Sequence, residues 1–122
     1  MTTAAIVGCG DVSIVHFEAL QALGIPVVGV VDVDPAGLAR AEAIAPRLPR
    51  YSSCQELLDV VRPDVVHVTT PHHQHEPVTR PLLEAGINVL QEKPLANTLA
   101  AGEALVEAAA ASEAKVGICL QN

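Results

Sequence analysis

The feature that most constrains the fold of this chain is a regular alternation of short apolar runs with longer helical segments. Residues 27–31 read Val-Val-Gly-Val-Val, an unbroken run that is typical of a strand buried on both faces of a sheet. Strands that are separated by helices pair in parallel through right-handed crossovers. The sequence therefore predicts an α/β fold with a doubly wound, mostly parallel sheet of six strands, in the order 3-2-1-4-5-6, and with helices on both faces. The expected strands cover residues 4–7, 27–31, 50–51, 64–69, 87–91 and 116–119.

Capping residues mark the ends of the expected helices. Asp34 and Pro35 supply an N-cap and a first-turn proline, and the Ser-Cys-Gln-Glu sequence at 53–56 is a capping-box pattern. Pro81 falls inside a later helix, where it removes a backbone donor, so we expect a kink there. On the first helix, an apolar stripe supports the assignment; its members are Val12, Val15, Ala19 and Leu23. The expected helices cover residues 12–23, 35–45, 54–60, 77–85 and 99–111.

Composition limits the functions that are open to the chain. Its 122 residues are 50% hydrophobic, which fits a single domain over residues 1–122, and no apolar run approaches the roughly 20 residues of a membrane span. The formal net charge of −7, from 14 acidic and 7 basic residues, argues against a nucleic acid or an anionic membrane as partner. The three cysteines, Cys9, Cys54 and Cys119, are far apart and lack paired metal spacing, which fits buried thiols in a reducing cytoplasm.

A glycine turn joins the first strand to the first helix, with the sequence Gly-Cys-Gly-Asp-Val-Ser at residues 8–13. Gly8 allows a tight turn, Gly10 lets the backbone approach a pyrophosphate, and the helix start offers free N–H groups. Ser13 stands where a third glycine or alanine is usual, and it is small enough to keep the helix close to the strand. The turn predicts a Rossmann dinucleotide site; the alternative is a tight turn without a ligand. The residues expected to contact the cofactor here are Gly8, Cys9, Gly10, Asp11 and Val12.

Asp32 follows the second strand, 19 residues beyond Ser13. This spacing fits an acid that accepts hydrogen bonds from the adenosine ribose. A carboxylate would repel a 2′-phosphate, and the next arginine, Arg40, falls along the next helix, so the sequence favours NAD as cofactor over NADP. The alternative is a turn or capping aspartate, although Asp34 is better placed for capping.

A loop rich in histidine follows the fourth strand, where the strand order of a doubly wound sheet reverses. Three histidines in residues 72–75 suggest a metal site, but no cysteine or carboxylate with ligand spacing accompanies them, so we expect no metal. The loop is instead expected to line the nicotinamide half of a cofactor site. The loop residues assigned to that site are Thr70, Pro71, His72 and His75, whereas His16 and His67 are interpreted as packing residues.

Lys93 lies in a Glu-Lys-Pro sequence at the end of the fifth strand, in a chain that has only two lysines. Ligands of open α/β sheets bind outside the carboxyl ends of the strands. A lysine there can donate a proton or hold a reacting oxygen, which makes Lys93 a candidate catalytic residue. The alternative is an ordinary solvated loop lysine.

Together these elements resemble the N-terminal half of the glucose-fructose oxidoreductase, inositol dehydrogenase and rhizopine-catabolism (Gfo/Idh/MocA) family. The resemblance rests on Gly8-Cys9-Gly10 with His16, Asp32, Thr70-Pro71 with His75, Glu92-Lys93-Pro94-Leu95 and residues 117–122. It implies a Rossmann domain followed by a second α/β domain, and oxidation or reduction of sugars, polyols and related carbonyl compounds with NAD(P). It also implies that Lys93 contacts the nicotinamide ribose and the substrate hydroxyl. Glu92 would line the cofactor pocket, and His75 would lie near the nicotinamide as a second catalytic candidate.

The chain ends at Asn122, where members of that family continue into the second domain. We therefore expect a truncated cofactor domain, inactive alone, whose full-length parent acts on a small-molecule substrate. The alternative is a non-catalytic dinucleotide-binding or sensing module. The last strand should lie at a sheet edge with unpaired backbone groups, flanked by the apolar residues Ile118 and Leu120. This predicts self-association as a homo-oligomer, most simply a two-fold dimer.

Overall fold

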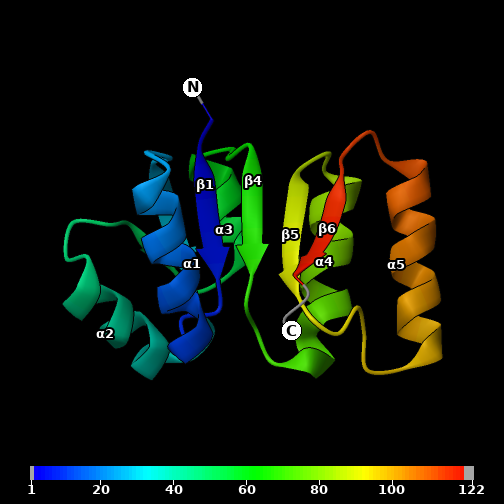
Figure 1. Cartoon of the computed structure of the whole chain (residues 1–122), viewed down its shortest axis with the longest axis horizontal. Coiled ribbons are helices and arrows are strands. Elements are labelled where there is room, and N and C mark those ends of the chain that lie inside the picture. Colours follow the sequence, from blue (N-terminus) through cyan, green and yellow to red (C-terminus); the bar gives the residue numbers. More distant parts are fainter. Residues whose placement is uncertain (1, 120–122) are drawn as a thin grey trace.

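The computed structural model describes residues 2–119, apart from the side chain of His72, and contains one six-stranded sheet (Figure 1). The strand order is β3-β2-β1-β4-β5-β6, and every neighbouring pair is parallel. Both the predicted fold class and the predicted strand order are confirmed. The strands are β1 (Ala4–Val7), β2 (Val27–Val31), β3 (Arg50–Tyr51), β4 (Val65–Val68), β5 (Asn88–Glu92) and β6 (Val116–Cys119).

The crossover helices cover both faces of the sheet, with α1 and α2 in front of it in Figure 1 and α3 and α4 behind. The predicted caps are present: Asp34 Oδ1 accepts a hydrogen bond from the Ala36 N–H, and Ser53 Oγ accepts one from the Glu56 N–H. Pro81 lies inside one continuous helix, α4. No helix within residues 2–119 has the length and hydropathy to cross a membrane. The helices are α1 (Asp11–Ala22), α2 (Pro35–Ile44), α3 (Cys54–Val60), α4 (His75–Glu84) and α5 (Leu99–Ala111), with a 3₁₀ turn, η1 (His72–Gln74).

The apolar stripe predicted for α1 is the wrong face of that helix. Val15 is 64% exposed and Leu23 is 73% exposed, whereas Ser13, His16 and Leu20 are buried. The glycine turn decides this orientation, because the third position of the turn must approach the strand closely. Ser13 fills that position, and the residues one and two turns later share its face. The helix was therefore predicted correctly, but its orientation was not.

The loops that follow β1 and β4 lie at the end of the sheet where a ligand is expected. β1 pairs with β2 on one side and with β4 on the other. The sheet continues from β2 to β3 on the first side and from β4 to β5 and β6 on the second. Ligands of such sheets bind at this switch point, outside the carboxyl ends of the strands. At the far side β6 pairs only with β5 among the described residues, so it forms the edge. The predicted dimer through this edge stays a prediction, and Leu120, which was expected to flank it, lies outside the described residues.

Candidate functional site

Two glycines in the turn after β1 are required for different reasons. Gly8 has φ +94°, and a Cβ there would lie 2.8 Å from Thr69 C and 2.8 Å from Thr70 N. The turn after β1 and the loop after β4 are thus in direct backbone contact. Gly10 has an ordinary extended backbone, with φ −84°, and a Cβ there would meet nothing within 4 Å. A side chain at residue 10 would therefore project into open space outside the turn.

The N-terminus of α1 faces this open space. The first N–H groups of a helix have no partner within the helix, and no side chain caps α1. Asp11 and Val12 are exposed at this end of the helix. The Ser13 hydroxyl donates a hydrogen bond to Gly10 O (2.5 Å). Free N–H groups and the positive end of the helix dipole favour a bound anion. The space beside Gly10 therefore fits a pyrophosphate.

Asp32 is held at the other side of the turn by backbone groups. Its Oδ2 accepts a hydrogen bond from the Cys9 N–H (2.9 Å), and its Oδ1 accepts one from the Asp34 N–H (2.9 Å). Gly37 makes room for this carboxylate, because a Cβ on Gly37 would lie only 2.0 Å from Asp32 Oδ2. Each carboxylate oxygen can accept more than one hydrogen bond. Asp32 is therefore fixed in place and still able to accept from a ribose hydroxyl.

Arg40 reaches the same turn, which its position along α2 did not reveal. Its Nε donates to Cys9 O (3.2 Å), so a positive charge lies beside the loop that Asp32 holds. Burial and the Asp32 charge raise the pKa of the Cys9 thiol to about 11, while Arg40 lowers it. Cys9 is therefore a protonated, buried packing residue of the turn. A cation therefore lies near the expected position of the ribose, where it bears on the choice between NAD and NADP.

A cavity of about 220 Å³ lies at the carboxyl ends of β1 and β2. Gly8, Asp32, Thr70 and Gln74 are among the residues that line it. Among the described residues, the Thr70 hydroxyl is a buried side-chain group without a hydrogen-bond partner. A buried polar atom of this kind is costly unless something pairs with it. The cavity therefore offers both room and an unsatisfied polar group to a ligand.

His75 is fully buried, and it joins the loop after β4 to the loop after β5. Its Nε2 lies 3.0 Å from Thr70 O, and its Nδ1 lies 2.8 Å from Pro94 O. Gln91, which is also fully buried, donates from Nε2 to Pro94 O (3.2 Å) and to Leu95 O (2.7 Å). The Thr79 hydroxyl donates to Gln91 Oε1 (2.6 Å) and fixes that amide. His75 and Gln91 therefore hold the backbone that carries Lys93.

Lys93 itself is exposed, and its peptide bond to Pro94 is cis. Pro71, on the loop after β4, is also exposed. The side chain of His72 lies outside the described part of the structure. The Lys93 ammonium is therefore accessible at the carboxyl end of β5, on a loop whose backbone is held by the buried side chains of His75 and Gln91.

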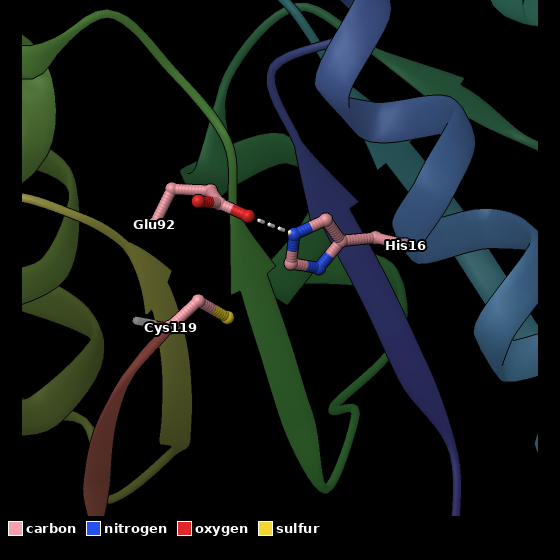
Figure 2. A group of neighbouring side chains, drawn as sticks. All are labelled: His16, Glu92 and Cys119. Carbon is pink, nitrogen blue, oxygen red and sulfur yellow. Dashed lines mark hydrogen bonds and ion pairs between the residues drawn. The ribbon is translucent and has the colours of Figure 1, made fainter. Parts of the chain in front are cut away.

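His16 links helix α1 to the end of β5 (Figure 2). Its Nε2 lies 2.7 Å from Glu92 Oε1, and its Nδ1 lies 2.9 Å from His67 Nδ1. The two imidazole rings meet edge to face. Burial and the neighbouring His16 lower the pKa of His67 to about 4, so His67 is neutral at pH 7. Both histidines were interpreted as packing residues, and the structure shows that they also form a buried polar chain that ends at Glu92.

The remaining cysteines are free thiols. Cys54 and Cys119 are half-buried, so the expectation of buried thiols holds fully only for Cys9. Burial raises the pKa of Cys54, and burial together with the Glu92 charge raises the pKa of Cys119. Cys119 Sγ points toward His16 and Glu92 in Figure 2.

Sequence reasoning missed Arg40, Gln91 and the role of His16. A signal for His16 was present, because it lies three residues after Ser13 and must share the buried face of α1. No comparable signal marked Arg40 or Gln91. Arg40 Nε and Gln91 Nε2 donate to backbone carbonyl oxygens, which carry no residue identity.

Comparison with known proteins gives a consistent result. The family model GFO_IDH_MocA, described as an oxidoreductase family with an NAD-binding Rossmann fold, matches residues 2–119. The inositol 2-dehydrogenase of Leifsonia xyli subsp. xyli is 37% identical over 90 residues, which are 72% of this chain and 26% of that protein. The inositol 2-dehydrogenase of Corynebacterium glutamicum (strain R) is 30% identical over 92 residues, which are 74% of this chain and 27% of that protein.

A solved structure supports the same relationship. The WlbA dehydrogenase from Chromobacterium violaceum, solved in complex with NADH and UDP-GlcNAcA, superposes with a TM-score of 0.90 and 30% sequence identity. The match covers 97% of this chain and 34% of that protein. The chain therefore spans about a quarter to a third of the length of these relatives.

Proposed function

The chain belongs to the GFO_IDH_MocA oxidoreductase family with its NAD-binding Rossmann fold, and from that premise we propose that it is the cofactor-binding part of a dehydrogenase. The proposed reaction moves hydride between a nicotinamide cofactor and a sugar, polyol or related carbonyl compound. Two relatives are named inositol 2-dehydrogenases, which supports a polyol-like substrate class. The full-length protein would act on a small molecule of this class.

The observation that carries the proposal is the open space beside Gly10, at an uncapped helix N-terminus and next to a fixed acid. Gly10 and the N–H groups of Asp11 and Val12 would hold the pyrophosphate. Asp32 would accept hydrogen bonds from the adenosine ribose, and Thr70 would pair its buried hydroxyl with the cofactor. Bound NAD supplies a hydride acceptor that amino-acid side chains lack.

Lys93 is the proposed acid–base or substrate-orienting residue. Its ammonium is accessible at the carboxyl end of β5, where it can donate a proton to a carbonyl oxygen or hold a hydroxyl oxygen. We propose that His75 contributes by positioning, because both of its ring nitrogens face backbone carbonyl oxygens. Glu92 would line the pocket beside Lys93. The second candidate function is that of a non-catalytic module, which binds the dinucleotide without turning over a substrate.

The cofactor proposal is tested by Gly10→Val. A Cβ at residue 10 meets no protein atom, so the variant should fold normally while its side chain fills the space proposed for the pyrophosphate. Overpacking typically costs about 1–3 kcal/mol, and 1.4 kcal/mol is a tenfold change in affinity, so we expect NAD affinity to fall by about 10²-fold. Isothermal titration calorimetry measures this.

Ala19→Val is the matched control, because it places the same valine side chain at an exposed position of α1, away from the turn. It should leave NAD affinity unchanged. Unaltered NAD binding by a folded Gly10→Val variant would remove the turn from the proposed site.

Cofactor choice gives a second expected result. The chain should bind NAD(H) more tightly than NADP(H). Asp32→Ser should lower the ratio of NAD(H) affinity to NADP(H) affinity by about tenfold, because it removes both the acceptor for the ribose hydroxyls and the repulsion of a 2′-phosphate. Adding Arg40→Ala to that variant should weaken NADP(H) again, since it removes the cation that lies beside the turn. Titrations of both cofactors against the unmutated chain, Asp32→Ser and the Asp32→Ser/Arg40→Ala double variant test this. Equal affinities in the unmutated chain would contradict the assignment of NAD.

A further inference from the structure

We propose that His16, Glu92 and Cys119 form a binding site for a divalent transition-metal ion of the zinc class. The three residues come from α1, β5 and β6 and lie far apart in the sequence, so they form no recognisable sequence motif. Glu92 also lines the proposed cofactor pocket, but the test below is done without NAD and reads out metal binding alone, so the two proposals are tested separately.

The geometry brings three ligand atoms to one point. One ligand atom of each residue, a ring nitrogen, a carboxylate oxygen and Sγ, lies within 4.8 Å of the other two. Figure 2 shows the three side chains directed toward one another. An ion bonded to nitrogen and oxygen at about 2.0–2.1 Å in tetrahedral geometry needs those atoms ~3.3 Å apart. His16 Nε2 and Glu92 Oε1 now lie 2.7 Å apart, so a small side-chain shift is enough to admit an ion.

The donor set selects the class of metal. One imidazole, one carboxylate and one thiolate are ligands of zinc sites, and three protein ligands leave a fourth position for water. Magnesium and calcium prefer sites made wholly of oxygen ligands, so a thiolate disfavours them. The structure therefore assigns the site to Zn²⁺ and to ions of similar preference such as Co²⁺.

His67 supplies the outer contact that holds a metal-binding histidine in place. Histidine ligands usually use their second ring nitrogen in a hydrogen bond, which fixes the ring orientation. His16 Nδ1 lies 2.9 Å from His67 Nδ1, on the side of the ring away from Glu92. His16 is thus oriented with Nε2 toward the proposed ion, and its other nitrogen is already engaged.

An ion can reach the group from solvent. Glu92 and Cys119 are both partly exposed, whereas His16 is buried behind them. Within the described chain, no helix lies over the front of β5 and β6 in Figure 1. The two outer ligands therefore border an open part of the sheet face.

Cobalt titration of the chain, free of any affinity tag and of NAD, tests the site. Apo protein in a phosphine reductant is titrated with Co²⁺ and followed in the ultraviolet and visible range, then back-titrated with Zn²⁺. We expect one Co²⁺ per chain, tetrahedral d–d bands and a thiolate-to-cobalt charge-transfer band that Zn²⁺ abolishes. Mg²⁺ in excess should not displace the cobalt.

Variants connect the spectrum to the residues. Cys119→Ser should remove the charge-transfer band, and Glu92→Gln should weaken binding while keeping that band. Loss of an outer contact costs about 10–100-fold in metal affinity, so we expect His67→Phe to fall in that range and Cys119→Ser to lose more than about 10²-fold. Cys54→Ser is the matched control, because it also removes a half-buried thiol with a raised pKa, on α3.

Circular dichroism shows which variants are folded, and only folded variants are compared. Cobalt spectra without a thiolate band in the unmutated chain would overturn the proposal. So would equal affinities in the unmutated chain, Cys119→Ser and Glu92→Gln. Loss of the band in Cys119→Ser alongside its retention in Cys54→Ser supports it.

Discussion

In a full-length protein that carries this chain, Lys93→Met is expected to lower turnover by about 10²-fold or more while NAD affinity stays within a few-fold. The methionine side chain is unbranched and only one atom shorter than that of lysine, and it removes the proton and the charge. Because Lys93 is exposed and its backbone is held by Gln91 and His75, the substitution should leave the loop in place. Steady-state kinetics with an inositol or sugar substrate, together with calorimetry for NAD, measures the two quantities.

Lys115→Met is the matched control, since the chain contains only these two lysines. Lys115 is exposed just before β6, at the opposite end of the sheet from the site, so its loss should not affect turnover. Near-normal turnover of Lys93→Met would exclude Lys93 from the mechanism. NAD binding with no turnover in the unmutated full-length protein would favour the non-catalytic candidate instead.

Gly8→Ala is expected to destabilise the chain by about 3 kcal/mol or more. A non-glycine residue in a sparsely populated backbone region costs about 1–3 kcal/mol, and forced overpacking adds about 1–3 kcal/mol. Both apply here, because φ is +94° and the new Cβ would lie 2.8 Å from backbone atoms of Thr69 and Thr70. The turn cannot move away easily, since the Gly8 N–H donates to Val31 O (2.7 Å). Urea denaturation measures the free energy of unfolding.

Gly24→Ala separates the two contributions. Gly24 also has a positive φ, +70°, but a Cβ there meets nothing within 4 Å. It should lose only the backbone part, about 1–2 kcal/mol. If the two variants were equally stable, the contact between the turn and the loop after β4 would carry no energetic weight.

Much of the fold could be predicted because it depends on local patterns. The β-branched run at 27–31 and the alternation of strands with helices led directly to the sheet order. The caps at Asp34 and Ser53 were predicted for the same reason, since each bonds an N–H group two or three residues away. The orientation of α1 was predicted wrongly because hydrophobicity alone was used. The packing requirement at Ser13 outweighed the apolar stripe.

The site could be predicted only in part. Gly8, Gly10, Asp32 and Lys93 belong to patterns with a mechanical reason for each residue, and the structure places them at one end of the sheet. The contact of Arg40 with Cys9 O could not be foreseen, because a long side chain on a helix can reach many places. The chain from His67 through His16 to Glu92 joins residues 51 and 76 positions apart, and only the folded sheet brings them together.

The hydrogen bonds that hold the loop after β5, which carries Lys93, affect how the sequence of that loop can change. His75 and Gln91 bond carbonyl oxygens of residues 94 and 95, and they make no demand on the side chains there. The path of the loop is thus set by two buried side chains, one at the start of α4 and one on β5, and not by the exposed side chains of the loop itself. Mutation at Leu95 or Ala96 can alter the shape and polarity of the surface that follows Lys93 while the lysine keeps its place. An engineer who wishes to vary that surface should randomise those two positions and leave His75, Thr79 and Gln91 unchanged.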